Sequence, residues 1–346
     1  MSDGTIVAVS DVHLDQWQSQ EPSTYEAKCN AFLRFLDWVS DGSDTGHFVI
    51  VGDLLDIPPT GNGADAQLLV RIGSRVRAMV DRGVTVHYLS GNHDIGLAGV
   101  AFSFPGIPVE IASRTVLQSG PSGVAFEHGH LLDAWLWEFA QRHAARRDTY
   151  LPEVTTAWFH SEGPLPEVAD AVNAYLHGTL VDALQWRPMT TGFTAEEQRW
   201  GIRVMSSLLD DGFADVAGQG ANPPCQEEIW ASIGRLGLRK EDLQGEGPLP
   251  EAASELFWLL GKCYYSPLPW RRAACRRLAA LRQQQPQLGG LVMGHTHAAD
   301  CFDWQDGDQP LHYANCGTWL GESGSCVVVR DGEITVHRRS WADWLP

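Results

Sequence analysis

The chain has 346 residues, of which 44% are hydrophobic, so it can bury a substantial core as one large domain or two ordinary ones. Its formal net charge of -18 argues against nonspecific binding to nucleic acid or to anionic membranes, because both attract basic surfaces. The N-terminus lacks the pattern of a signal peptide and no stretch has the roughly 18 apolar residues of a membrane span, which predicts a soluble, cytoplasmic protein without a transmembrane segment.

The first third of the chain predicts three buried strands that alternate with amphipathic helices. The pattern indicates strands at 5–9, 47–51 and 84–89 and helices at 24–41 and 65–82. Each strand ends in a polar cluster: Asp11 and His13 follow the first strand, Asp53 the second and Asn92 the third. Ligands of such α/β sheets gather outside the carboxyl ends of the strands, so we expect these side chains to converge.

Two further strands end in histidines. A β-rich stretch at 107–127 ends at His128, and a short apolar run ends at Gly294, just before His295 and His297. In a continuing strand the last two imidazoles would point to opposite faces. A turn that begins at Gly294 can instead direct both toward one point.

The residues between these two strands differ in character. Residues 131–288 show helical periodicity or helix-favouring composition in several stretches, which predicts an inserted helical cap. Eight of the 14 tryptophans of the chain lie there, and we expect most of them to fill the core of the cap. The segment also carries two basic clusters, which are either solvated helix faces or a clamp for a second phosphate or another anion. These clusters are Arg142, Arg146 and Arg147, and Arg271, Arg272, Arg276 and Arg277.

Residues 310–338 follow the last histidines. They indicate two or three strands with turns, consistent with a mainly antiparallel second sheet.

Together the strand ends supply oxygen and imidazole-nitrogen donors without a thiolate. The candidate ligands are Asp11, His13, Asp53, Asn92, His128, His295 and His297. Such a set suits divalent Mn, Fe, Zn, Ni or Co, of which we favour Mn. Seven ligands exceed one four-coordinate site, whereas a bridging carboxylate would give each of two ions four protein donors. Without a cation, so many buried carboxylates and imidazoles in one place would be costly.

This ordered pattern of D-x-H, G-D-x-x-D, G-N-H-D, H and G-H-x-H resembles the calcineurin-like metallophosphoesterases, over residues 5–130 and 289–338. The resemblance implies an α/β fold of four layers, α/β/β/α, in which two mixed sheets face each other. It also implies a discontinuous catalytic domain of residues 1–130 and 289–346, interrupted by the inserted helical cap at 131–288.

The resemblance assigns the ligands as well. It implies that Asp11, His13, Asp53 and His297 hold one metal ion and that Asp53, Asn92, His128 and His295 hold the other. A hydroxide that bridges the two ions would then attack phosphorus in line. By the same likeness, His93 lies beside the leaving-group oxygen as general acid or transition-state stabiliser, and Asp94 orients the ring of His93.

Several polar residues near the motifs have two interpretations. Asp56 either caps the helix that follows or supports a ligand from behind. His130 either touches substrate phosphate or begins the cap. We interpret His47 and His87, which lie within or at the start of predicted strands, as packed and hydrogen-bonded residues.

The sequence thus predicts a hydrolase of phosphate esters or pyrophosphates that acts on a phosphorylated small-molecule or amphiphilic substrate. The segment from Tyr313 to Trp319 also resembles the corresponding segment of UDP-2,3-diacylglucosamine hydrolases. In those hydrolases, however, an arginine usually stands at the position of His93, and the insertion is much shorter than in this chain. The alternatives are a nuclease or a protein serine/threonine phosphatase of the same fold, and a protein-binding scaffold. The acidic charge disfavours the nuclease, and the complete ligand set disfavours the scaffold.

Overall fold

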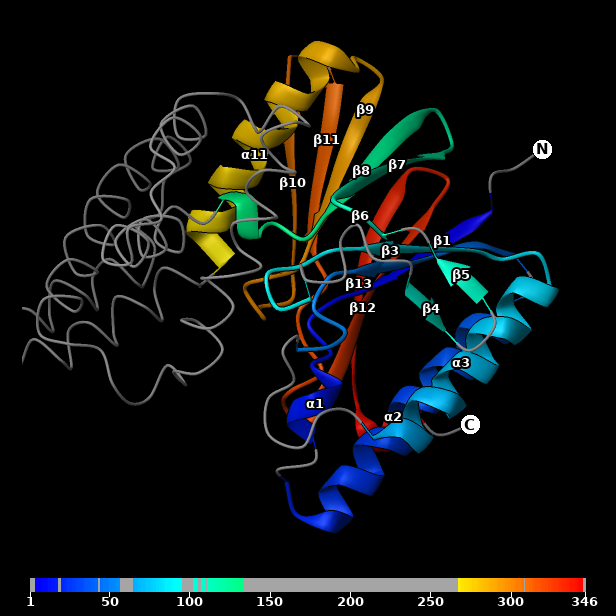
Figure 1. Ribbon diagram of the computed structural model, residues 1–346. Helices are drawn as coiled ribbons and strands as arrows, with labels where there is room; N and C mark the ends of the chain where they lie inside the picture. Colours follow the sequence, from blue (N-terminus) through cyan, green and yellow to red (C-terminus); the bar gives the residue numbers. More distant parts are fainter. Residues whose placement is uncertain are drawn as a thin grey trace, which may run out of the picture.

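The fold is seen here in a computed structural model. It describes residues 4–17, 20–42, 44–56, 65–94, 102–104, 107–109, 111–132, 267–307 and 309–344. Within these residues two mixed β-sheets lie face to face, with helices on their outer faces (Figure 1). The predicted four-layer α/β arrangement is therefore confirmed.

The first sheet has six strands in the order β13-β12-β1-β2-β3-β6. These strands are β1 (Thr5–Val9), β2 (Thr45–Val51), β3 (Thr85–Leu89), β6 (Ile111–Ala112), β12 (Ser323–Arg330) and β13 (Glu333–Ser340). The strands β1, β2, β3 and β6 are parallel, and the hairpin of β12 and β13 extends the sheet antiparallel to β1. The parallel part directs the ends of β1, β2 and β3 to one edge.

The second sheet has five strands in the order β10-β11-β9-β8-β7. These strands are β7 (Arg114–Ser119), β8 (Ser122–Glu127), β9 (Leu288–Met293), β10 (Asp300–Asp306) and β11 (Gln309–Asn315). The central strands β8, β9 and β11 are parallel, while β7 and β10 pair antiparallel at the two edges. A separate hairpin joins β4 (Phe102–Phe104) and β5 (Ile107–Val109).

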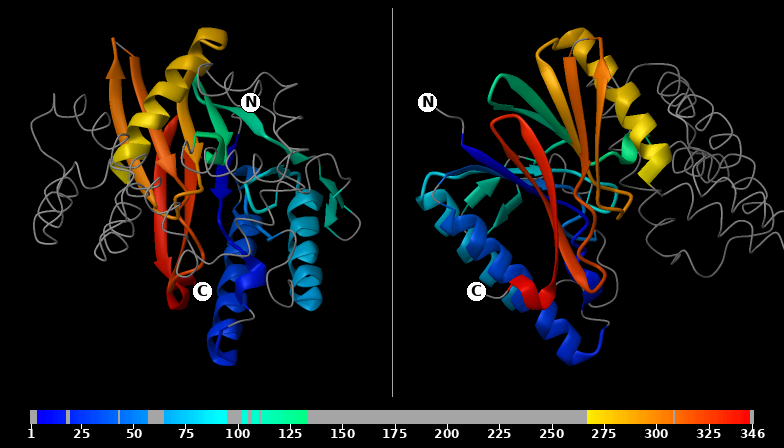
Figure 2. Two further views of the ribbon diagram at one scale, coloured as in Figure 1. Left: turned by 60° about the vertical axis from the view of Figure 1, so that its left-hand side comes forward. Right: turned by 180° about the vertical axis from the view of Figure 1, so that it is seen from behind.

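The helices cover both outer faces. On the first sheet lie α2 (Pro22–Asp41) and α3 (Ala66–Asp81), packed against each other, and α11 (Pro267–Gln284) packs on β9 and β11 (Figure 2). The apolar face of α3 is buried at helical spacing through Leu68, Ile72, Val76 and Met79. The helix is capped at its N-terminus by Asp65, whose side chain accepts a hydrogen bond from the backbone N–H of Gln67. Short helical turns are α1 (Leu14–Trp17), η2 (His130–Leu132) and η4 (Trp341–Trp344).

The apolar run of β1 is continuous because both of its faces are buried. Ile6 and Ala8 point into the core between the two sheets, whereas Val7 and Val9 point into the core between the first sheet and its helices. The strand is thus fixed from both sides, and the polar residues that follow it start from a rigid position.

Two sequence-based expectations need correction or qualification. The prediction of a mainly antiparallel second sheet from residues 310–338 is wrong, because β11 runs parallel to β9 and the hairpin β12–β13 belongs to the first sheet. Strand β12 pairs antiparallel with β1 through Val327, Val328 and Val329. The last helix of the predicted cap, α11, lies on the second sheet. The rest of the predicted cap, residues 133–266, lies outside the described residues, together with seven of its tryptophans and its first basic cluster.

Candidate metal centre

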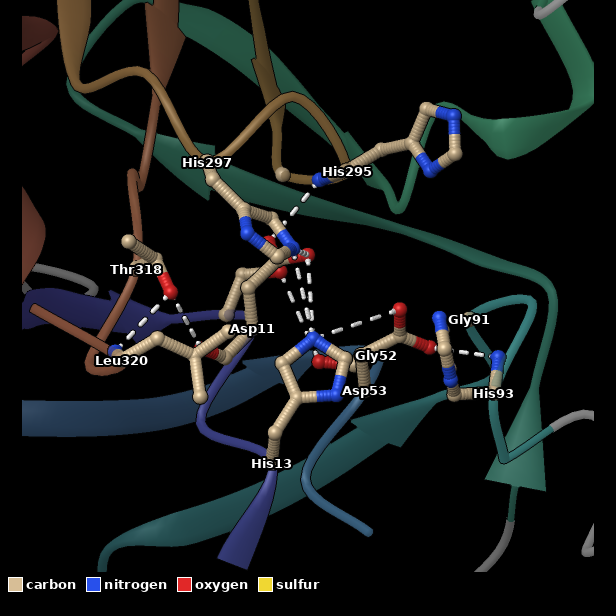
Figure 3. Close-up of polar contacts among 12 residues, drawn as sticks. Asp11, His13, Gly52, Asp53, Gly91, His93, His295, His297, Thr318 and Leu320 are labelled. Atoms are coloured by element: carbon tan, nitrogen blue, oxygen red, sulfur yellow. Dashed lines mark hydrogen bonds and ion pairs between the residues drawn. The ribbon is translucent and has the colours of Figure 1, made fainter. Parts of the chain in front are cut away.

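Loops that follow β1, β2, β3, β8 and β9 meet at one end of the two sheets. Backbone hydrogen bonds join them: the N–H of Asp11 donates to the Gly52 carbonyl, and the N–H of Gly294 donates to the His128 carbonyl. Figure 3 shows Asp11, His13, Asp53 and His297 pointing toward one another from these loops. The strand-end clusters therefore converge as the topology predicts.

Five of the candidate ligands have a left-handed backbone. Among the described residues other than glycine, six have positive φ, and only Asp331 of these lies outside the centre. The five are Asp11 (52°), His13 (50°), Asp53 (54°), His295 (71°) and His297 (59°). Such a conformation costs of order 1–3 kcal/mol per residue and is typical of functional sites, where surrounding structure enforces it.

One half of the centre is formed by Asp11, His13 and His297. Their ligand atoms lie within 4.8 Å of one another. The Nε2 atoms of His13 and His297 are 3.3 Å apart, and Asp11 Oδ1 is 3.2 Å from His297 Nε2. Asp11 Oδ1 is buried and accepts no hydrogen bond from the described residues. A cation between these atoms would give all three a partner.

The other half contains Asn92, His128 and His295. The amide Oδ1 of Asn92 lies 2.9 Å from His295 Nδ1 and 3.2 Å from His128 Nε2. Asp53 connects the halves, since its Oδ2 is 3.1 Å from His128 Nε2 and 3.9 Å from His13 Nε2. The carboxylate of Asp53 therefore occupies the position that a bridging ligand would need.

Hydrogen bonds behind two imidazoles fix their tautomers. His128 Nδ1 donates to the carbonyl of Val51 at 2.7 Å, and His13 Nδ1 donates to Asp56 Oδ1 at 2.7 Å. Each bond leaves Nε2 directed at the centre, and a lone pair on that atom is what a metal ion requires.

The charges of the cluster depend on one another. Burial alone would raise the pKa of Asp11, but His128 and His297 outweigh it and lower that pKa to about 2. Burial likewise opposes the charge of His128, yet Asp53 and Asp11 raise its pKa to about 10. The carboxylates are thus anionic and attract positive charge, which a proton on His128 supplies here and divalent cations could supply instead.

Asp56 supports two imidazoles at once. Its Oδ1 lies 2.7 Å from His13 Nδ1 and 3.2 Å from His93 Nδ1, and its Oδ2 accepts a hydrogen bond from Gln16. Asp65, and not Asp56, caps the helix that follows. Of the two interpretations of Asp56, the structure therefore favours support of a candidate ligand.

The carboxylate of Asp94 is placed differently from the sequence-based expectation. Its Oδ2 accepts hydrogen bonds from the backbone N–H of Leu54 and from the hydroxyl of Tyr88, and its Oδ1 accepts from the N–H of Gly91. Asp94 thus ties the loop after β3 to the loop after β2, and the carboxylate placed against the His93 ring is Asp56. Sequence adjacency favoured Asp94 as the partner of His93, whereas the carboxylate 3.2 Å from its Nδ1 belongs to Asp56, which comes from another loop.

Gly91 and Gly294 leave space for the carboxylates of the candidate ligands Asp53 and Asp11. A Cβ on Gly91 would lie 2.0 Å from Asp53 Oδ1, and a Cβ on Gly294 would lie 1.9 Å from Ser10 Oγ and 2.6 Å from Asp11 Oδ2. Neither position needs a positive φ, so the requirement at both is space.

The loop after β11 holds the centre from behind. Asn315 donates to the carbonyl of Gly294 at 2.7 Å, and both the hydroxyl of Thr318 and the N–H of Trp319 donate to the carbonyl of Asp11. Sequence reasoning found this segment only through its likeness to a family motif and missed its contacts with the ligand loops.

His130 lies next to the centre and is buried. Both ring nitrogens lack a hydrogen-bond partner among the described residues. Trp270, in the first turn of α11, packs edge-on to His295 with ring centroids 5.4 Å apart. The structure thus places the ring of His130 beside the candidate ligands His128 and His295.

Two arginines of the second basic cluster and two strand histidines contact other side chains of the fold. Arg271 pairs with Asp300 through two hydrogen bonds, and Arg277 pairs in the same way with the buried Glu127. An anion clamp at these two arginines is therefore not supported. The imidazoles of His47 and His87 lie 3.1 Å apart, nitrogen to nitrogen, in adjacent strands, as expected of packed histidines.

Comparisons with known proteins agree with the motif pattern. A family model described as calcineurin-like phosphoesterase matches residues 4–299. No functionally curated protein gives a significant match. In the part of the chain described here, no helix combines the length and apolar character needed to cross a bilayer.

Solved structures with similarity to the chain include a predicted phosphoesterase of Streptococcus pneumoniae, at 12% identity and a TM-score of 0.32, covering 98% of this chain and 90% of that one. Vacuolar protein sorting 29 of Cryptosporidium parvum matches at 10% identity and a TM-score of 0.32, covering 97% and 96%. The same protein of Chaetomium thermophilum matches at 9% identity and a TM-score of 0.33, covering 97% of both chains.

Proposed function

Because the chain belongs to the calcineurin-like phosphoesterase family, we propose that it hydrolyses a phosphate ester or pyrophosphate with two divalent cations held at the candidate metal centre. The observation that carries the proposal is the position of Asp53, whose Oδ2 faces His128 Nε2 on one side and His13 Nε2 on the other. A carboxylate between two groups of nitrogen and oxygen donors is what a pair of cations needs.

The donor set fits such cations. Asp11, His13, Asp53 and His297 would hold one ion, and Asp53, Asn92, His128 and His295 the other. The buried Asp11 Oδ1 without a hydrogen bond and the inward Nε2 atoms of His13 and His128 support this assignment. Oxygen and imidazole donors accept several divalent ions, among which we favour Mn. Bound there, the ions would make an attacking water more acidic and neutralise charge on the phosphoryl group.

His93 is suited to protonate the leaving group. Its backbone N–H donates to Asp53 Oδ1 at 2.8 Å, and Asp56 lies against its ring nitrogen Nδ1 at 3.2 Å. Burial opposes the charge of the ring, but Asp53 and Asp56 raise its pKa to about 9. The side chain is 22% exposed, so the imidazole can reach a substrate oxygen and serve as its proton donor.

The substrate we propose is a phosphorylated small or amphiphilic molecule. The first test is hydrolysis of an aryl phosphate monoester, an aryl diester and a nucleotide-sugar pyrophosphate by metal-analysed protein supplied with manganese. Asp53→Asn should abolish hydrolysis and reduce bound metal, while Glu333→Gln, an exposed carboxylate on β13, should change neither. Full activity of Asp53→Asn would refute the bridging role.

A second test separates metal binding from proton donation. His93→Asn should keep the metal content and lose rate by about 10²–10⁴-fold. Because a good leaving group needs no proton, the loss should be much smaller for p-nitrophenyl phosphate than for phenyl phosphate. Equal losses for both esters would remove His93 as the acid.

A further inference from the structure

We propose that His130 is a substrate-positioning residue, which donates a hydrogen bond to a phosphoryl oxygen bound at the metal centre on the side of Asn92, His128 and His295. The inference rests on the proposed function, because the phosphoryl group is the ligand which that function brings to the centre. It adds a residue outside the seven candidate ligands.

The imidazole of His130 is buried without hydrogen-bond partners among the described residues. The side chain is only 3% exposed, and neither Nδ1 nor Nε2 has a hydrogen-bond partner among the described residues. A neutral imidazole has one N–H to donate and one nitrogen that accepts, and burying both unmade is unfavourable. Buried polar groups without partners in a native fold are uncommon and point to a role that a ligand completes.

The ring of His130 lies beside two of the candidate ligands. Its centroid lies 5.4 Å from that of His128 and 6.4 Å from that of His295. The preceding Gly129, with φ of 100°, makes the turn that places the two imidazoles together, and a Cβ there would lie 2.3 Å from Met293 Cε. The turn is therefore built around a glycine that keeps His130 against the centre.

His130 is placed to contact substrate and not to complete a set of metal ligands. The motif pattern supplies four donors for each ion with Asp53 shared, so His130 is not needed to complete either set. Its ring is adjacent to the rings of the candidate ligands His128 and His295. An oxygen atom of a group bound at the ions could reach its N–H, and phosphoryl oxygens are strong acceptors.

The test measures phosphate binding, so it does not depend on turnover. Inorganic phosphate is titrated calorimetrically into the manganese-loaded full chain, and metal content and thermal unfolding are measured on the same samples. His130→Phe keeps a buried ring and removes both nitrogens, whereas His130→Gln keeps a donor. His337→Phe on β13 is the matched control for a histidine-to-phenylalanine change far from the centre in sequence and sheet order.

We expect His130→Phe to bind phosphate about tenfold more weakly, the effect of losing one hydrogen bond, with unchanged metal content and no loss of thermal stability. His130→Gln should recover most of the affinity, and His337→Phe should match the wild type. With an aryl phosphate, the loss in His130→Phe should appear mainly as a higher KM.

Unchanged phosphate affinity in His130→Phe would overturn the inference, as would loss of metal together with affinity, which would make His130 a ligand or a structural residue. Absence of phosphate binding by the wild type would also overturn it. If the wild type hydrolyses no ester but His130→Phe still weakens phosphate binding, the proposed function fails and the contact stands.

Discussion

Replacing Gly91 by alanine tests whether the loop after β3 is shaped around the bridging carboxylate. The new Cβ would lie 2.0 Å from Asp53 Oδ1, 2.7 Å from its Cγ and 2.8 Å from its backbone nitrogen. Ordinary contact begins near 3.4 Å, so the carboxylate or the loop must retreat by about 1.4 Å. Asp53 has little room, because it is 1% exposed and its other oxygen lies 3.1 Å from His128.

A displacement of this size at a bridging group predicts a large loss of function. Misplacing a catalytic group by about 1 Å costs on the order of 10²-fold in rate, and overpacking a core site typically costs about 1–3 kcal/mol of stability. We therefore expect Gly91→Ala to lose about 100-fold in kcat/KM on an aryl phosphate and to hold less metal. Steady-state kinetics at saturating manganese, elemental analysis and denaturant unfolding measure the three effects.

Gly321 provides the matched control for this experiment. A Cβ there meets nothing within 4 Å, and its backbone does not need a positive φ. Gly321→Ala should stay within about 0.5 kcal/mol of the wild type and keep its activity. If Gly91→Ala shows the same metal content and kcat/KM as the wild type, the loop yields freely and the steric reasoning is wrong.

Three further predictions follow from contacts of buried groups. Asp56→Asn should lower kcat/KM about 10–100-fold at unchanged fold, and the raised pKa of His93 should fall in a pH–rate profile; an unchanged profile would contradict the supporting role. Burial lowers the pKa of His87 in the folded protein, so below about pH 6.5 the unfolded chain binds more protons than the folded one and the free energy of unfolding should decline. Urea unfolding at pH 5–8 should show a weaker decline for His87→Gln than for the wild type. Arg277→Met should lower the free energy of unfolding by about 3–5 kcal/mol, because it removes the ion-pair partner of the buried Glu127 carboxylate. The double variant Arg277→Met with Glu127→Leu should recover most of this loss in the same unfolding assay.

Much of the fold could be predicted because the relevant signals are local. The apolar runs at 5–9 and 47–51 coincide with β1 and with most of β2, since strands buried on both faces need continuous apolar sequence. The sheet to which β12 and β13 belong could not be predicted. Their burial pattern suits either sheet, and only long-range pairing with β1 decides between them.

The candidate site, like the fold, could be predicted from the sequence only in part. The ligand residues stand out in the sequence because each follows a strand end, and parallel strands bring such ends to one edge. The partner of His93 could not be derived that way, because Asp56 reaches it from another loop while the adjacent Asp94 binds Tyr88 and Leu54. Contacts between loops depend on side-chain directions, which spacing along the chain does not encode.

The pairing of β8 with β9 has an evolutionary consequence. These neighbouring parallel strands are separated in sequence by the long insertion, yet His130 follows the one and Trp270 opens the helix that leads into the other, and both rings lie beside His295. The insertion thus departs from and returns to the rim of the reaction centre. Insertions of different length and sequence could therefore be exchanged there while the strand ends that hold the candidate ligands stay in place.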